Sequence, residues 1–447
     1  MSFAWFATAM LPQNGRAADS LPNIVLIISD DQSWTDYSFM GHEIIQTPNL
    51  DRLARQSVTF RRAYVPTALC RPSLATLVTG LYAHQHGITG NDPAPTAANR
   101  QHAERAGLDA REILISNIDK HPTAPRLLRE KGYLSFQCGK WWEGGYQRGG
   151  FTHGMTRGFP DQGGRHGDDG LKIGRQGMQP VNDFIDAAME AKQPFFLWYA
   201  PFLPHAPHNP PARLLEKYEL PGRPRAFAAY YAMCEWFDET CGQLLDQLDK
   251  KGIADNTLVV YVTDNGWIQS RELGKYAKRS KRSPYEGGTR TPIMFRWPRH
   301  LEPAERPELC SSIDIVPTIL AAADVAIPKD LPGINLLPHL ERGTPIERDA
   351  IYGESFAHDI ADVEKPQASL LHRWVIRGHD KLLLTYDGQA GRIRFPPESG
   401  EPQLFDLQAD PTELVNLASQ KPELVDELRV LLERWYPVTQ LNVDAVP

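Results

Sequence analysis

The chain has 447 residues, of which 48 are Lys or Arg and 55 are Asp or Glu, so its formal net charge is −7. This acidic balance excludes the broad basic surface of a nucleic-acid-binding protein, and an anionic substrate would need positive charge concentrated within its site. The length is sufficient for two or three domains of about 150 residues, or for one large α/β domain with a smaller companion.

The first 20 residues are similar to the apolar core and small-residue end of a secretory signal, although no basic leader precedes them. Apolar side chains such as Trp5 and Phe6 come first, and small residues follow at Ala17 and Ala18. We therefore expect an exported protein, either periplasmic or extracellular. Because no stretch of about 18 apolar residues occurs elsewhere, we expect no transmembrane span.

Two apolar runs rich in β-branched residues predict central parallel strands that are covered on both faces. They occupy residues 23–29 and 258–263. Each run is followed at once by polar side chains, and parallel strands place these at a common edge of the sheet. The residues that follow the two runs are Asp30, Asp31, Asp264 and Asn265.

Helical patterns alternate with strands along most of the chain, which predicts an α/β fold built on a doubly wound sheet. Further strands are expected at residues 133–137 and 195–199. Residues 139–177 are rich in glycine and histidine without clear periodicity, and predict a long ordered loop. The predicted helices cover residues 48–56, 123–131, 181–191, 225–250 and 313–323.

The pattern changes near residue 350, where short antiparallel strands replace the alternation. We therefore expect a main domain over residues 21–347 and a smaller α+β domain over residues 348–447. The expected strands of the smaller domain cover residues 374–376, 381–385 and 403–407, and the closing helix covers residues 423–435.

Residues 68–80 predict a loop that leads into a helix. Pro72 suits the first turn and Gly80 the position just past the end. Cys70 would then lie among unpaired N–H groups at the positive end of the helix dipole, which favours an anion and activates a nucleophile. One buried helical face is predicted by the spacing of Leu74, Leu77, Val78 and Leu81.

The two strand-end pairs supply hard oxygen donors, which suit calcium or magnesium better than zinc or copper. Either pair alone could instead cap a helix or form a turn. A divalent cation would offset the repulsion among three carboxylates, bind an oxygen of the substrate and lower the pKa of an attacking hydroxyl group.

The Cys-x-Pro-Ser motif at Cys70, with its Leu-x-Thr-Gly ending at Gly80, resembles the signature of the type I sulfatases of the alkaline phosphatase superfamily. Residues 47–53, 312–318 and 404–411 extend the resemblance over nearly the whole chain. It implies an alkaline-phosphatase-like α/β/α sandwich around a large, mostly parallel sheet, with a smaller C-terminal domain. It also implies hydrolysis of a sulfate ester, for which we favour a sulfated carbohydrate.

The resemblance implies that a formylglycine-generating enzyme converts Cys70 to 3-oxoalanine (formylglycine), whose hydrated aldehyde attacks sulfur. It places the converted residue 70 in one calcium site with Asp30, Asp31, Asp264 and Asn265, and makes magnesium a second choice. Asp264 would accept the proton of the nucleophile, and His205 or Lys281 would protonate the leaving alcohol. The residues placed around the sulfate by motif are Lys140, His205, His208 and Lys281.

Two positions depart from the family pattern. The family has arginine four residues after the cysteine, where this chain has Leu74, and we expect Arg71 to compensate in binding the substrate. The family also has a histidine where this chain has Trp142. In the family, that histidine assists elimination of sulfate from the formylglycine. We expect His153 or His166 from the glycine-rich loop to take over this role.

Two other functions fit parts of the same pattern. A phosphodiesterase or phosphonate monoester hydrolase of the same superfamily would use much the same metal site. A catalytically silent protein that binds sulfated glycans is suggested by Leu74 and Trp142.

Overall fold

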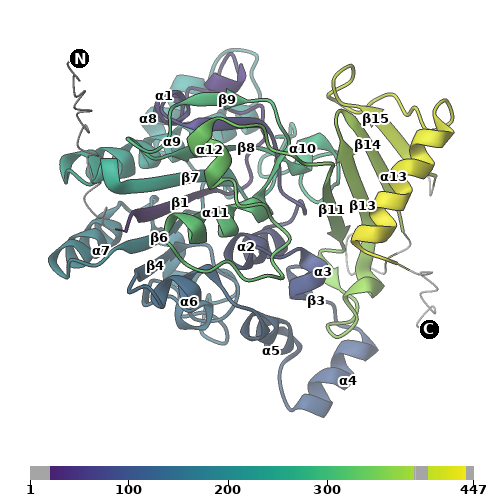
Figure 1. Cartoon of the computed structure of the whole chain (residues 1–447), viewed down its shortest axis with the longest axis horizontal. Helices are drawn as coiled ribbons and strands as arrows, with labels where there is room; N and C mark the ends of the chain where they lie inside the picture. Colours follow the sequence, from purple (N-terminus) through teal and green to yellow (C-terminus); the bar gives the residue numbers. More distant parts are fainter. Residues whose placement is uncertain (1–20, 387, 389–400, 439–447) are drawn as a thin grey trace, which may run out of the picture.

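The computed structural model describes residues 21–386, 388 and 401–438 (Figure 1). The expected signal segment, residues 1–20, lies outside the described residues. A large α/β/α sandwich forms most of the molecule, and a second, smaller sheet with one long helix stands beside one end of it. Among the described helices, none is long and apolar enough to cross a membrane.

The larger sheet is almost entirely parallel. Its spatial order is β10-β2-β8-β7-β1-β6-β4-β5, with β9 also paired to β2, and only β8 runs antiparallel to its neighbours. Its strands are β1 (Asn23–Ser29), β2 (Val58–Tyr64), β4 (Leu134–Gly139), β5 (His153–Gly154), β6 (Phe195–Ala200), β7 (Thr257–Thr263), β8 (Arg290–Arg296), β9 (Ala304–Arg306) and β10 (Cys310–Ser311).

Side chains of the central strands alternate between two separate cores. Leu26 of β1 lies in one core and Val25 in the other, and both are fully buried. The first core is covered by α2 (Cys70–Thr79), α6 (Ala124–Arg129), α11 (Ile315–Ala322) and α12 (Leu337–Arg342). The second is covered by α1 (Pro48–Arg55), α7 (Gln179–Glu190) and α9 (Arg225–Lys250).

The smaller sheet is antiparallel, in the order β11-β13-β14-β15. Its strands are β11 (Ile351–Phe356), β13 (Leu370–Arg377), β14 (Asp380–Thr385) and β15 (Gln403–Asp406). The helix α13 (Pro422–Trp435) packs on one face. On the other face Trp374 contacts Tyr64, the last residue of β2, so this sheet stands at the carboxyl edge of the larger one.

Short elements complete the described chain. The short strands β3 (Asp92–Pro93) and β12 (Asp359–Ile360) pair in parallel. They connect the part of the chain around the larger sheet with the part around the smaller sheet. The remaining α-helices are α3 (Ala83–His86), α4 (Ala97–Ala106), α5 (Ala110–Ile115), α8 (Ala212–Tyr218) and α10 (Glu286–Thr289).

The predicted fold class is confirmed, and two local expectations are corrected. All ten residues of α2 are buried, so the single buried face was too narrow a prediction. The helix is enclosed because its side chains pack in the first core with the sheet and α11, and its first residue, Cys70, joins the polar cluster described below. Residues 139–177 are also not purely loop, because β5 and the 3₁₀ helices at Tyr146–Gly149 and Asp168–Lys172 lie within them.

Candidate active site

The two polar pairs that follow β1 and β7 meet at the carboxyl edge of the sheet. The strands pair in parallel up to Ser29 and Thr263, so the residues after them are neighbours. The backbone N–H of Asp31 donates to Asp264 Oδ1 at 3.1 Å, and Asn265 Nδ2 donates to Asp31 Oδ1 at 2.7 Å.

Asp31 departs from the extended conformation of the strand before it. Its φ of 66° lies in the left-handed region, which is uncommon for a residue with a side chain. Successive side chains of a strand point to opposite faces. The turn at Asp31 allows its carboxylate and that of Asp30 to contribute to one polar cluster.

Lys140 reaches this cluster from the end of β4. A Cβ atom on Gly139 would lie 1.8 Å from the carbonyl oxygen of Ala200, so only glycine permits the backbone to turn there. The N–H of Lys140 donates to that same carbonyl at 2.7 Å. Its Nζ then donates to Asp30 Oδ1 at 2.7 Å and lies 3.8 Å from Asp264 Oδ2.

Cys70 is the first residue of α2, as predicted, and Gly80 follows the helix with a φ of 75°. The thiol is buried, and its Sγ lies with carboxylate oxygens of Asp30 and Asp31 and a ring nitrogen of His205 in one group whose atoms are within 4.8 Å of one another. Burial raises the pKa of the Cys70 thiol to about 12, against the attraction of the nearby lysines. The unmodified thiol is therefore protonated at neutral pH, contrary to the activation expected from the helix dipole alone.

Lys281 and His205 lie on the other side of Asp31. Lys281 Nζ is 2.6 Å from Asp31 Oδ1 and 3.5 Å from His205 Nε2. The N–H of Arg282 donates to the carbonyl of Ala68, which ties this segment to the loop before Cys70. His205 Nδ1 lies 2.6 Å from the carbonyl oxygen of Ala206. Nδ1 therefore carries the proton, and Nε2 faces the cluster.

Burial and charge set the protonation of these groups. Burial lowers the pKa of His205 to about 4, despite the attraction of Asp30 and Asp31, so the ring is neutral at pH 7. Burial also lowers the pKa of Lys281, but Asp31 and other anionic groups outweigh it and raise the pKa well above its usual value. Burial raises the pKa of Asp30 to about 7, although Lys140 opposes this.

The residues present fit a hard divalent cation. Three buried oxygens of the cluster accept no hydrogen bond, namely Asp30 Oδ2, Asp264 Oδ2 and Asn265 Oδ1. Buried oxygens are rarely left without a partner in native proteins. The three carboxylates of Asp30, Asp31 and Asp264 outnumber the two ammonium groups, so an added cation would turn the centre positive. A calcium or magnesium ion is therefore compatible with this donor set.

His208 and Arg71 are both buried near the cluster but differ in their partners. The ring of His208 lies 5.3 Å from that of Tyr230, whose hydroxyl donates to the Asp31 carbonyl, and both ring nitrogens lack a hydrogen-bond partner. The guanidinium of Arg71 is instead bound by both carboxylate oxygens of Glu143 and by the Asn91 carbonyl. The expected free cation at Arg71 is thus neutralised, because Glu143 occupies its donors.

The two histidines of the glycine-rich loop lie in different places. The His166 ring lies 5.3 Å from the Trp142 ring and 5.5 Å from that of Phe202, which stacks on His205 at 4.3 Å. His153 is exposed, pairs with Phe136 in the middle of β4 and contacts Phe184 of α7. His153 therefore lies several residues before the strand end that carries Lys140, and the structure does not bring it to the cluster.

Two contributors to this region were not predicted. Glu143 neutralises Arg71, and Phe202 lies between His166 and His205 with Lys140 Nζ 5.6 Å from its ring centre. Neither carries a spacing or motif signal. Only their position, three residues after Lys140 and three before His205, could have indicated them.

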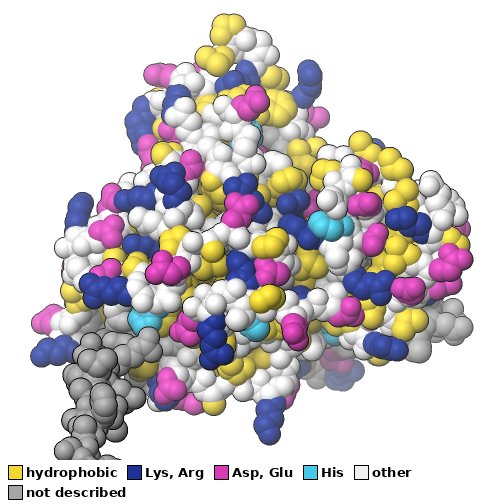
Figure 2. Space-filling model, turned by 45° about the horizontal axis from the view of Figure 1, so that its top comes forward, with side chains coloured by type: hydrophobic (Ala, Val, Ile, Leu, Met, Phe, Trp, Pro, Cys, Tyr) yellow, Lys and Arg dark blue, Asp and Glu magenta, His cyan; other side chains and the backbone are white. Residues whose placement is uncertain are grey.

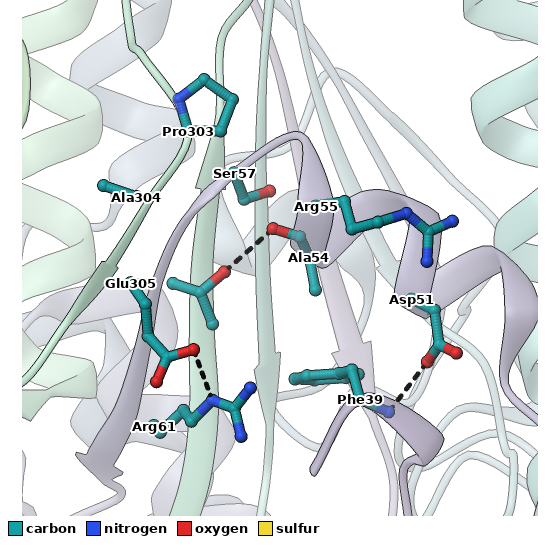
Figure 3. A pocket seen from close by; sticks show the side chains of 10 residues that line it. Phe39, Asp51, Ala54, Arg55, Ser57, Arg61, Pro303, Ala304 and Glu305 are labelled. Atoms are coloured by element: carbon teal, nitrogen blue, oxygen red, sulfur yellow. Dashed lines mark hydrogen bonds and ion pairs between the residues drawn. The ribbon is translucent and has the colours of Figure 1, made fainter. Parts of the chain in front are cut away.

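A pocket of about 340 Å³ lies elsewhere, between α1, β2 and β9 (Figure 3). It shares no residue with the cluster. Three of its four charged side chains bind within the protein, since Arg61 pairs with Glu305 and Asp51 accepts from the N–H of Phe39. We therefore assign it no part in catalysis.

A cation-compatible cluster of carboxylates, lysines and histidine at the carboxyl edge of a mostly parallel sheet defines a hydrolase site for anionic esters. Residues 22–325 match the family model "Sulfatase", and residues 274–435 match the model "N-sulphoglucosamine sulphohydrolase, C-terminal". The chain belongs to the sulfatase family and is a sulfuric ester hydrolase.

Individual relatives agree with this assignment. Arylsulfatase A of Homo sapiens is 28% identical over 93% of this chain and 88% of its own length. N-acetylgalactosamine-6-sulfatase of Homo sapiens is 30% identical over 74% of this chain and 68% of its own. The crystal structure of Ps i-CgsB superposes with a TM-score of 0.72 at 25% identity, covering 95% of this chain and 94% of that one, and was also solved in complex with k-i-k-neocarrahexaose.

Proposed function

We propose that this sulfatase hydrolyses a sulfate ester carried by a carbohydrate. The observation that carries the proposal is the position of Cys70 Sγ, within 4.8 Å of carboxylate oxygens of Asp30 and Asp31 and a ring nitrogen of His205. The carbohydrate is supported by the relatives, since one is named N-acetylgalactosamine-6-sulfatase and another was solved in complex with k-i-k-neocarrahexaose.

The proposed cation is calcium, and the proposed nucleophile derives from Cys70. Asp30, Asp31, Asp264, Asn265 and residue 70 would hold the ion, and their partnerless oxygens support this ligand set. Calcium would supply positive charge for a sulfate oxygen and acidify a neighbouring hydroxyl group. Formylglycine at position 70, made by a formylglycine-generating enzyme, would supply the hydroxyl that the protonated thiol cannot replace.

The remaining roles belong to side chains that the fold already fixes. Lys140 and Lys281 would bind the non-bridging sulfate oxygens, since both are buried and held by aspartates. Lys281 would give a proton to the departing alcohol, either directly or through His205, whose unprotonated Nε2 lies 3.5 Å from the Lys281 Nζ and could pass the proton on. Asp264 would take the proton of the nucleophile, as its Oδ2 accepts no hydrogen bond and burial raises its pKa.

Three further residues are proposed around the substrate. His166 would act where the family has a histidine and this chain has Trp142, because its ring lies against that indole. His208 would border the sugar, since both its ring nitrogens lack a partner. Arg71 would act as a positioning residue through Glu143 rather than as a ligand of the sulfate.

We also propose that the protein is exported and that its main domain spans residues 21–347, with the smaller domain at 348–447. The apolar start of the chain and the separate antiparallel sheet support these two proposals.

Release of inorganic sulfate tests the function. The protein is co-expressed with a formylglycine-generating enzyme and assayed on an aryl sulfate, sulfated oligosaccharides, an aryl phosphodiester and an aryl phosphonate. Preferential release of sulfate, abolished in Cys70→Ala, is the expected result. Faster turnover of the phosphodiester or phosphonate would overturn the proposal in favour of the related activities, and binding of sulfated glycan without any turnover would indicate a silent protein.

A further inference from the structure

A hairpin rich in basic residues connects two residues of the site. The hairpin begins after Asn265 and ends before Lys281. Its two arms pair with each other. Gln269 and Tyr276 form an antiparallel bridge, and the N–H of Ala277 donates to the carbonyl of Ile268 at 2.7 Å. The two arms of the hairpin thus lead from the cluster outward to a turn at the surface.

The hairpin concentrates positive charge in a chain whose net charge is −7. Residues 271–282 hold six basic side chains and one acidic side chain, Glu272. On the face shown in Figure 2, Lys and Arg are interspersed with Asp and Glu, so a run of one sign is a local feature. The basic residues are Arg271, Lys275, Lys278, Arg279, Lys281 and Arg282.

Three of these cations are available to a ligand. Arg271, Lys275 and Lys278 are exposed, and none forms an ion pair with a residue that the structure describes. Many other surface cations are paired, as Arg213 is with Glu239. Cations beside a site that form no ion pair can attract an anionic ligand without first breaking an ion pair within the protein.

The length of chain between the exposed cations and the cluster limits how far from it they can lie. At about 3.3 Å per residue of extended chain, Lys278 lies at most about 10 Å from Lys281 along the backbone, and Lys275 at most about 20 Å. The sulfate that is cleaved would contact Lys281 itself. By the same measure Arg271, six residues after Asn265, lies at most about 20 Å from that end of the hairpin. All three exposed cations are therefore within reach of anionic groups on neighbouring sugars of the same substrate.

We propose that this hairpin binds further sulfate or carboxylate groups of a polyanionic glycan, so that the preferred substrate carries several anionic sugars rather than one. The inference rests on the proposed function for the identity of the cleaved ester. Because the contacts are exposed, each is worth little alone and is weakened by salt. Together they act on substrate binding and not on the bond that breaks.

The test compares two matched triple variants of the full chain. The first is Arg271→Gln/Lys275→Gln/Lys278→Gln. The control, Arg129→Gln/Lys192→Gln/Lys250→Gln, removes the same residue types from exposed positions that precede β4, β6 and β7, at the opposite edge of the sheet. The substrates are a hexasaccharide sulfated on every disaccharide unit and 4-nitrophenyl sulfate.

For the hairpin variant we expect kcat/KM on the hexasaccharide to fall about tenfold through KM, with a weaker salt dependence. Turnover of 4-nitrophenyl sulfate should stay within about twofold of the parent, as should both substrates with the control variant. Equal losses on both substrates, or no loss on the hexasaccharide, would overturn the inference and leave the proposed function intact.

A binding measurement separates the two proposals. The hexasaccharide is titrated into Cys70→Ala protein with and without the hairpin substitutions, followed by fluorescence anisotropy. Weaker binding in the hairpin variant supports the inference even if no sulfate ester is ever cleaved. Equal binding of a single-stranded oligonucleotide of the same charge would overturn it, because the hairpin would then bind polyanions without regard to sugar.

Discussion

Arg71 and Glu143 form a buried bidentate ion pair, with Nε–Oε1 and Nη2–Oε2 distances of 2.8 Å. The pair joins the first turn of α2 to the segment that follows β4, so it fixes Cys70 relative to Lys140. It also cancels the charge of Arg71. The positive charge for a sulfate must then come from Lys140, Lys281 and the proposed cation.

Breaking this pair should destabilise the protein strongly. Glu143→Ala leaves a buried guanidinium without a counter-charge, which costs about 3–5 kcal/mol in the free energy of unfolding. The double variant Arg71→Met/Glu143→Leu should recover most of that loss, because neither charge remains. Urea unfolding measures both variants, and a Glu143→Ala protein as stable as the parent would contradict the importance of the pair.

Removal of Lys281 should reduce turnover far more than removal of a neighbouring exposed lysine. Lys281→Ala loses a preorganised cation beside the substrate, and we expect kcat to fall about 10²–10³-fold. Lys278→Ala serves as the control on 4-nitrophenyl sulfate and should stay within about twofold. Circular dichroism checks that both variants are folded. Similar rates for the two would remove Lys281 from the proposed chemistry.

Calcium should stabilise the protein by binding to the carboxylates of Asp30, Asp31 and Asp264. Addition of calcium after treatment with EGTA should raise the thermal midpoint, and at about 100 times Kd the gain is about 2.7 kcal/mol. Asp264→Asn should abolish most of the shift, because it removes one anionic ligand. Calorimetric titration of the metal-free protein gives the stoichiometry. A thermal midpoint that does not change when calcium is added, or that rises equally in Asp264→Asn, would count against this ligand set.

His166 should matter for activity and His153 should not. The ring of His166 lies against Trp142, whereas His153 is exposed beside α7. Burial lowers the pKa of His166 to about 3. The ring is thus neutral from about pH 5 to about pH 8, and the activity ratio of the parent to His166→Ala should stay constant over that range. Equal activity of His153→Ala and His166→Ala would exclude the role.

The lowered pKa of His166 also makes the free energy of unfolding depend on pH. The folded pKa of His166 lies below the unfolded value near 6.5, so the unfolded chain binds the extra proton first as the pH falls. His166 therefore costs no stability at neutral pH and destabilises the fold increasingly below about pH 6.5. The His166→Ala protein should lose less stability than the parent between pH 6 and about pH 4.

Much of the site was predictable because parallel strands end at one edge. Asp30, Asp31, Asp264 and Asn265 follow two apolar runs, and that pattern alone brings them together. The left-handed turn at Asp31 was not predictable, because the residues that hydrogen-bond to Asp31 there, Asp264 and Asn265, lie 233 and 234 residues away in the sequence.

Other features depended on long-range pairing that one sequence does not reveal. Arg71 and Glu143 are 72 residues apart, and nothing in their neighbourhood marks one for the other. Burial likewise reverses the expected activation of the Cys70 thiol. The basic run at residues 271–282 is visible in the sequence, but its closeness to the site follows only from the fold, which brings Asn265 and Lys281 into one cluster.

The central claim is that residue 70 acts as formylglycine beside the carboxylate cluster. The direct measurement is mass spectrometry of the peptide that contains residue 70, in protein co-expressed with a formylglycine-generating enzyme and assayed for sulfate release. We predict the mass of the aldehyde or its hydrate, in proportion to the activity of each preparation. An intact thiol in a preparation that releases sulfate at the full rate would contradict the account.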